Sequence, residues 1–217
     1  MAGLGIVDAP GVNRRESFTR ELRYSKDAVV VLAGIPGAGK STLLQRLLPD
    51  GAYGDVRVLD SGRVRERWMP VLGVLPYSWW RPLVHLTHYV QVLRAMRSDG
   101  PLVIHDCATR PWIRRLIGWR ARRSARPIHL ILLDVPGYVA HNGQQARGRV
   151  VRSRSMATHC RRWPQLLAQA VNNPAHVFPG ALSAIILNRR QAIELEKITF
   201  EPNRTKRREH PGLVGKD

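Results

Sequence analysis

Short apolar runs alternate with longer stretches of helical spacing through most of the chain. Five runs rich in Val, Leu and Ile predict buried strands: Ala28–Ala33, Val56–Leu59, Leu102–Ile104, Ile128–Leu133 and Leu182–Leu187. The intervening stretches predict helices: Ser41–Leu48, Arg81–Arg97, Trp112–Arg123 and, within a longer region, Tyr138–Val171. Strands that alternate with helices pair in parallel, because each crossover returns across a sheet face. The pattern therefore predicts an α/β fold with a doubly wound, mainly parallel sheet of about five strands.

The two ends of the chain lack this pattern. Residues 1–25 carry scattered charge without a clear period, which predicts a flexible leader or a short packed arm. Residues 26–200 form one predicted domain, and a chain of 217 residues with 44% hydrophobic composition is long enough to bury a core. Residues 201–217 are polar and basic, which predicts a disordered tail.

The chain is strongly basic, with a formal net charge of +19 from 35 basic and 16 acidic residues. Such a charge suits polyanionic partners, including nucleic acid. Only five of the basic residues are Lys, however, and a skew toward Arg is also typical of coding bias. The charge alone therefore does not decide whether the protein binds nucleic acid.

Cysteine content and hydropathy narrow the class of protein. Cys107 and Cys160 form neither a secreted disulfide framework nor a CxxC zinc motif. No signal peptide is visible at the N-terminus. The longest apolar stretch, Met69–Val92, is interrupted by prolines and Arg81, so it predicts no membrane span. We expect a soluble cytoplasmic protein.

The segment from Gly34 to Ser41 matches the phosphate-binding pattern G-x-x-x-x-G-K-[ST] at every fixed position. It follows a predicted strand and opens an amphipathic helix, so its backbone N–H groups and the helix dipole converge on one anion. Lys40 is suited to reach the outer phosphates, and Ser41 to bind Mg²⁺. The motif predicts binding of ATP and Mg²⁺ by these residues: Gly34, Pro36, Gly37, Ala38, Gly39, Lys40, Ser41 and Thr42.

Carboxylates follow several predicted strands. A P-loop needs a carboxylate for its Mg²⁺, and Asp106 is favoured over Asp134 because the third strand usually lies beside the P-loop strand; Asp134 suits a helix cap better. Asp60, after the second strand, is either the base that accepts a proton from an attacking hydroxyl or an N-cap, and one residue can do both. Arg63 is suited to hold an anionic group of the acceptor.

Basic residues follow the fourth strand in the position of a lid. Arg147 and Arg149 are predicted to clamp the transferring phosphoryl group, the alternative being a solvated surface. His159 is expected to be structural. The cluster Trp68, Trp79 and Trp80 predicts packing or a cover over the acceptor pocket.

These motifs together resemble a group of small kinase-like P-loop ATPases, often classed as an AAA-type domain and related to polynucleotide kinase, zeta toxins and chloramphenicol phosphotransferase. The resemblance rests on Gly34–Thr42, Asp60-x-x-Arg63, Asp106, Leu133-Asp-Val-Pro136 and Arg147-Gly-Arg149, and it covers about Val29–Leu187. It implies a three-layer P-loop NTPase fold with a helical lid. It also implies phosphoryl transfer with Asp60 as base and the two lid arginines as clamps. Gln144 and Gln145 depart from the family, whose members tend to have another lid arginine there.

Three functions compete at this stage. The first is a kinase that transfers the γ-phosphate of ATP to a hydroxyl of a small molecule or of a nucleic-acid end. The second is an ATP-binding switch or slow ATPase without a phosphoryl acceptor. The third is a nucleic-acid-associated ATPase that uses the basic surface, although no nucleic-acid-binding module is visible.

Overall fold

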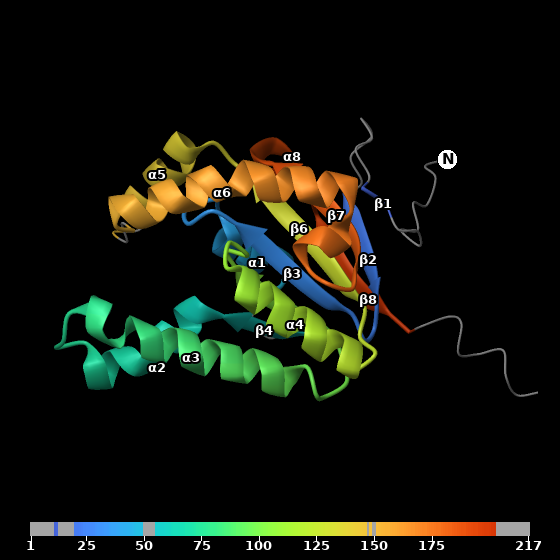
Figure 1. The fold of residues 1–217 in the computed structure, drawn as a ribbon, viewed down its shortest axis with the longest axis horizontal. Helices are drawn as coiled ribbons and strands as arrows, with labels where there is room; N and C mark the ends of the chain where they lie inside the picture. Colours follow the sequence, from blue (N-terminus) through green and yellow to red (C-terminus); the bar gives the residue numbers. More distant parts are fainter. Residues whose placement is uncertain (1–10, 13–19, 50–54, 147, 149–150, 203–217) are drawn as a thin grey trace, which may run out of the picture.

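The main sheet is parallel throughout (Figure 1). The computed structural model describes residues 11–12, 20–49, 55–146, 148 and 151–202. The strands lie in the order β1-β7-β6-β3-β5-β4. Their bounds are β1 Gly11–Val12, β3 Val29–Gly34, β4 Arg57–Asp60, β5 Leu102–Asp106, β6 Ile128–Asp134 and β7 Ala181–Asn188. All five strands predicted from the sequence form, and β1 adds a short strand at one edge.

The helices connect these strands in the doubly wound manner that the sequence predicts. They are α1 Lys40–Leu47, α2 Ser61–Leu72, α3 Tyr77–Ala95, α4 Pro111–Arg123, α5 Gly137–Gln145, α6 Ser153–Asn172, α7 Pro174–Val177 and α8 Arg189–Glu194. In Figure 1 the pair α2 and α3 lies on one side of the molecule, and α5 and α6 lie on the other. Within the described residues, no helix is both long and apolar enough to cross a membrane.

The centre of the sheet is the core of the protein. All six residues of β3 are buried, and so are the first six residues of β6. Burying an aliphatic side chain such as Val31 or Leu32 contributes about 1.5–3 kcal/mol to stability relative to leaving it exposed. The uninterrupted apolar runs in the sequence therefore reflect strands covered on both faces.

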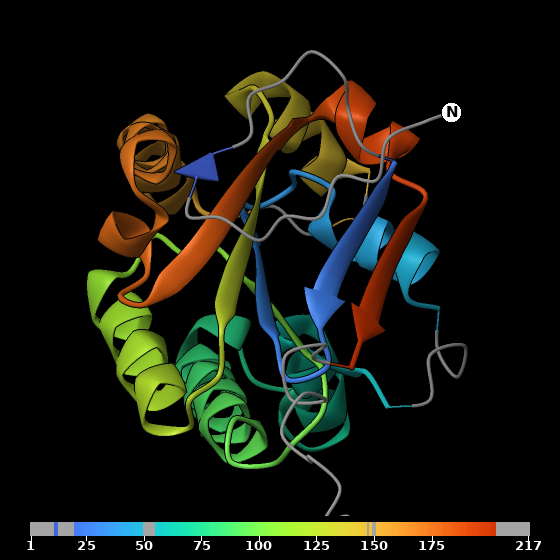
Figure 2. The same ribbon diagram turned by 90° about the vertical axis from the view of Figure 1, so that its right-hand side faces the viewer.

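A second, two-stranded sheet was not predicted. Strand β2, Glu21–Ser25, pairs in parallel with β8, Lys197–Glu201 (Figure 2). Residues 21–25, the end of the segment for which the sequence predicts a flexible leader or a short packed arm, form one of these strands, and Leu22 is buried in the main core. The remainder of the predicted tail, residues 203–217, lies outside the described residues.

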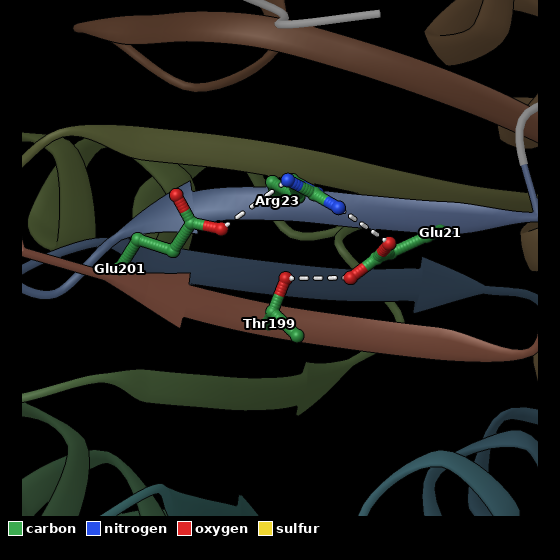
Figure 3. A network of polar contacts seen from close by, with 4 residues as sticks. All are labelled: Glu21, Arg23, Thr199 and Glu201. Carbon is green, nitrogen blue, oxygen red and sulfur yellow. Dashed lines mark hydrogen bonds and ion pairs between the residues drawn. The ribbon is translucent and has the colours of Figure 1, made fainter. Parts of the chain in front are cut away.

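Polar side chains link the two strands of this small sheet (Figure 3). Arg23 donates to Glu21 at 2.9 Å and forms an ion pair with Glu201 at 3.5 Å. Thr199 Oγ1 donates to Glu21 Oε1 at 3.2 Å. Because polar and apolar residues alternate over only five positions, the sequence gives little signal for a strand here.

A smaller apolar cluster joins α2 to α3. Val64, Trp80 and Val84 are buried in it, and Trp68 packs against them. Trp79 is 73% exposed. Of the three tryptophans in the sequence cluster, Trp68 and Trp80 therefore serve in packing.

Arg126 holds together the end of the sheet opposite the P-loop. Its side chain is only 7% exposed. The guanidinium donates to the backbone carbonyls of Asp27 at 3.0 Å and Ser98 at 2.8 Å, and also to that of Gly100. These carbonyls belong to the segments that lead into β3 and β5, so one side chain fixes the start of both central strands.

We predict that Arg126→Met destabilises the protein by about 2–4 kcal/mol, because several buried carbonyls lose a charged donor together. Urea denaturation gives the free energy of unfolding. The matched control is Arg97→Met, since Arg97 is exposed and its change is expected to stay within about 0.5 kcal/mol. An Arg126→Met protein as stable as the control would contradict this role.

Candidate active site

The phosphate-binding loop joins β3 to α1. Gly37 and Gly39 have φ values of +89° and +93°, a left-handed conformation that favours glycine. Lys40 is 5% exposed, and its Nζ donates to the carbonyls of Gly34 at 2.7 Å and Ile35 at 3.1 Å. In the described chain, α1 has neither a side-chain cap nor an acidic residue in its first turn. The start of α1 therefore presents an uncompensated positive dipole end to an anion.

Helix α5 lies directly against this loop. A Cβ atom at Gly37 would come within 2.0 Å of the Ala140 carbonyl oxygen, and one at Gly143 within 2.7 Å of the Gly37 oxygen. Gln144, 3% exposed, donates through Nε2 to the Pro36 carbonyl at 2.9 Å and accepts from the Val151 N–H at 2.7 Å. Gln144, one of the two glutamines that depart from the family pattern, therefore ties the loop to the chain that follows α5.

Asp60 is the N-cap of α2, as one reading of the sequence predicts. Its Oδ1 accepts from the Gly62 N–H at 2.8 Å and lies 2.8 Å from Nδ1 of His105 on the neighbouring strand. Burial by itself raises the pKa of this carboxyl, but His105 and the Gly62 N–H outweigh burial and hold the pKa at about 2. Asp60 is therefore a carboxylate at neutral pH.

Asp106 ends β5, and β5 pairs directly with the P-loop strand β3. Strand β6, which ends at Asp134, also pairs with β3, so the strand order places both carboxylates on strands beside the P-loop strand. The Tyr89 hydroxyl lies 3.4 Å from Asp106 Oδ1. Burial, followed by the Asp106 charge, raises the pKa of Tyr89. Asp134 is exposed at the end of β6, and the N-cap of α5 is Pro136 rather than Asp134.

One cavity of about 830 Å³ brings most of the predicted site residues together. Its lining includes Pro36, Gly37, Gly39, Lys40, Ser41, Thr42, Asp60, Arg63 and Asp106. Gly34 contributes the carbonyl that holds Lys40. The predicted lid arginines, Arg147 and Arg149, lie outside the described residues.

A second cavity of about 510 Å³ lies on the other side of the loop. Ala38 and Thr42 line it from the P-loop side, Val135 from the segment after β6, and Val139 from α5. Arg189 and Ile193 of α8 complete it. Helix α8 directly follows β7, the last strand of the main sheet.

A third cavity of about 570 Å³ extends from the first toward α3, α4 and α6. Sequence reasoning missed most of its lining. His159, expected to be structural, faces it and has its Nδ1 2.9 Å from Thr109 Oγ1. His85, Arg81 and Arg110 also line it. Arg81 and His85 lie one helical turn apart on α3, but Arg110 and His159 come from the start of α4 and from α6, so no local spacing in the sequence connects the three groups.

The histidines of the third cavity are neutral at physiological pH. Burial first, and then nearby positive charges, lower the pKa of His85 and of His159 to about 4. For both residues Arg110 is among those charges. These rings can therefore donate or accept hydrogen bonds with a hydroxyl without adding charge.

The donor set of the first cavity fits a magnesium ion. Ser41 and Asp106 supply a hydroxyl and a carboxylate to the same space. Mg²⁺ keeps most of its waters and takes few protein ligands. The described residues contain no group of three or more His, Cys, Asp or Glu placed to hold a metal ion.

The fold and this site define a kinase-like P-loop ATPase. Residues 29–169 match the AAA domain family AAA_33, and the chain belongs to that family. No curated protein sequence matches the chain significantly.

Solved structures are similar to this chain at low sequence identity. A proposed kinase of Chloroflexus aurantiacus J-10-fl is 17% identical, with a TM-score of 0.53 over 76% of this chain and 89% of that one. A chain of the PezAT chromosomal toxin–antitoxin system of Streptococcus pneumoniae is 13% identical, with a TM-score of 0.47. The match covers 59% of this chain and 55% of that one, so this chain spans about half its length.

The neutral state of His159 predicts a pH dependence of stability. Its pKa in the folded protein, about 4, lies below the ordinary value of 6.5, so the unfolded chain binds this proton first as the pH falls. The free energy of unfolding therefore decreases from pH 6.5 toward pH 4. His159→Gln should make this decrease less steep, by an amount that corresponds to at most about one bound proton. Urea denaturation at several pH values measures it. The exposed His141→Gln is the control, and equal slopes for wild type and His159→Gln would refute the assignment.

Proposed function

We propose that this protein is an ATP-dependent phosphotransferase that transfers the γ-phosphate to a hydroxyl group of an acceptor. The observation that carries the proposal is the juxtaposition, around one cavity, of the P-loop residues Lys40 and Ser41 with Asp60 and Asp106. The kinase-like P-loop fold of the family supports this reaction class at the general level.

The cavities on the two sides of the P-loop would together accommodate one nucleotide. The phosphates would bind the backbone N–H groups of the loop and the start of α1, with Lys40 beside them. The adenine would bind the second cavity near Arg189 and Ile193. Ser41 and Asp106 would hold Mg²⁺, which supplies charge neutralisation at the transferring phosphate.

The reaction forms one bond and breaks one. The acceptor oxygen bonds to the γ-phosphorus, and the bond from that phosphorus to the β–γ bridging oxygen breaks, so that ADP leaves. The hydroxyl proton passes to Asp60. The products are the phosphorylated acceptor and ADP.

Asp60 is suited to orient the attacking hydroxyl. Its Oδ1 is occupied by the Gly62 N–H and by His105, whereas Oδ2 has no hydrogen bond in the part of the chain that the structure describes. With a pKa of about 2 the carboxylate is a weak base. Phosphoryl transfer has a loose transition state that needs positioning more than strong base catalysis, so a weak base suffices.

Positive groups would stabilise the charge of the transferring phosphate. Lys40 lies in the first cavity, and Arg63 lines it from the start of α2. We also propose that Arg147 and Arg149 complete this set from the segment between α5 and α6. Charge neutralisation and positioning then provide most of the rate enhancement.

Replacing Asp60 tests the proposal directly. Asp60→Asn keeps the size of the side chain but loses its charge, and transfer from γ-labelled ATP to a phosphorylated metabolite or other hydroxyl acceptor should fall about 100-fold or more. The affinity for Mg²⁺–ATP should stay within about threefold, because Asp60 faces the acceptor. Asp134→Asn is the control, since Asp134 also ends a strand but is exposed. Full transfer activity in Asp60→Asn would exclude Asp60 from this role, and hydrolysis that no hydroxyl compound accelerates would favour an ATP-dependent switch.

A further inference from the structure

The third cavity carries a large excess of positive charge. Its charged side chains are Asp106 on one side and, from the described residues, Arg65, Arg81, Arg110 and Arg152 on the other. The first cavity is balanced by comparison: Lys40 and Arg63 face Asp60, Glu66 and Asp106. The positive charge is therefore concentrated in the third cavity, toward α3, α4 and α6.

In the described part of the chain, three of these arginines, Arg81, Arg110 and Arg152, do not serve to hold the fold together. Within the described residues, no ion pair or hydrogen bond joins Arg81, Arg110 or Arg152 to another side chain. Arg126 is an example of a structural arginine, because its guanidinium donates its hydrogen bonds to backbone carbonyls. Arg65 is held in place by stacking, with its guanidinium carbon 4.6 Å from the centre of the Tyr77 ring.

Three helices begin at this cavity. Tyr77 and Ser78 start α3, Arg110 is the N-cap of α4, and Arg152 is the N-cap of α6. In Figure 1 the three helices run from left to right, with α3 and α6 beginning at the left of the view and α4 nearer its centre. In the described structure none of these helices has a side-chain cap or an acidic residue in its first turn. An N-cap usually carries a polar acceptor, so an arginine there adds to the positive end of the dipole and leaves it without a compensating anion.

The pKa values of the neighbouring histidines reflect the same positive charge. Burial is the main cause of the lowered pKa of His85, and Arg110 and Arg81 lower it further. His159 behaves in the same way, with Lys40 and Arg110 as the next causes after burial. Both rings stay neutral beside the arginines, so they are free to bond hydroxyl groups there.

The third cavity opens onto the place of phosphoryl transfer. The first and third cavities share Pro36, His85, Tyr89, Asp106 and Cys107. A molecule in the third cavity therefore lies next to the Mg²⁺ carboxylate and the P-loop. It can extend a hydroxyl toward Asp60 while its other end stays among the arginines.

We propose that the phosphoryl acceptor is a small hydroxylated anion, whose phosphate or carboxylate group binds Arg81, Arg110 and Arg152 in the third cavity. This inference rests on the proposed function and specifies its substrate class. Guanidinium groups bind both kinds of anion through paired N–H donors. A volume of about 570 Å³ is in the range of small-molecule sites, which favours a metabolite over a nucleic-acid strand.

Binding of matched compounds to the full chain tests the substrate class. Glucose, glucose 6-phosphate and gluconate share a hydroxylated body and differ in charge, and each is titrated by calorimetry into protein saturated with Mg²⁺–ADP, which blocks the P-loop. We expect glucose 6-phosphate, gluconate or both to bind at least about tenfold more tightly than glucose. The preferred anion distinguishes a phosphate from a carboxylate acceptor.

Variants locate the site. Arg110→Gln and Arg81→Gln should each weaken binding of the preferred anion about tenfold or more, because each removes a charged donor. Arg81 is exposed on α3, so its replacement leaves the fold intact even if Arg110→Gln does not. Arg115→Gln, on the exposed face of α4, is the control and should bind as wild type does.

Several results would overturn the proposal. They are equal binding of glucose and the two anions, no binding of either anion, unchanged affinity in both arginine variants, or preferential binding of a single-stranded oligonucleotide. If Mg²⁺–ADP itself does not bind, the proposed function fails separately. The same titrations in nucleotide-free Lys40→Ala protein then still decide whether the third cavity binds small anions.

Discussion

The parallel pairing of the main sheet is the constraint on which the whole site depends. Because every strand runs in the same direction, their carboxyl ends meet at one edge. Strand β3 ends in the P-loop, β5 ends at Asp106 beside it, and β4 ends at Asp60 opposite His105. Residues far apart in the sequence thus meet around one cavity without any long loop to carry them.

A second constraint fixes the loop itself. Gly37 and Gly143 allow the backbones of the P-loop and α5 to approach more closely than any side chain permits. Gln144 then joins the Pro36 carbonyl to the Val151 N–H, just before α6 begins. One buried side chain therefore links the P-loop to a residue that lines the third cavity. In the proposed function this link would help to position the nucleotide and the acceptor relative to each other.

The sequence predicts the parts of this structure whose signals are local. Apolar runs give the buried strands, the glycine pattern gives the P-loop, and Asp60 before Ser-Gly gives the cap of α2. Prediction from the sequence fails where the interacting residues lie far apart in the chain. The strand Glu21–Ser25 alternates over too few residues to be recognised, and it pairs with residues more than 170 positions away. His159 and Arg110 face one cavity only because α4 and α6 start at the same edge, and no spacing in the sequence encodes that.

Calorimetric titration of Mg²⁺–ATP into the purified chain tests the central claim most directly, that the P-loop holds the nucleotide. We predict saturable binding to one site in the wild type and a loss of about tenfold or more in Lys40→Ala, because a charged donor beside the phosphates is removed. Lys197→Ala, which removes an exposed lysine on β8, should bind as the wild type does. Absence of binding by the wild type, or equal affinity in Lys40→Ala, would contradict the account.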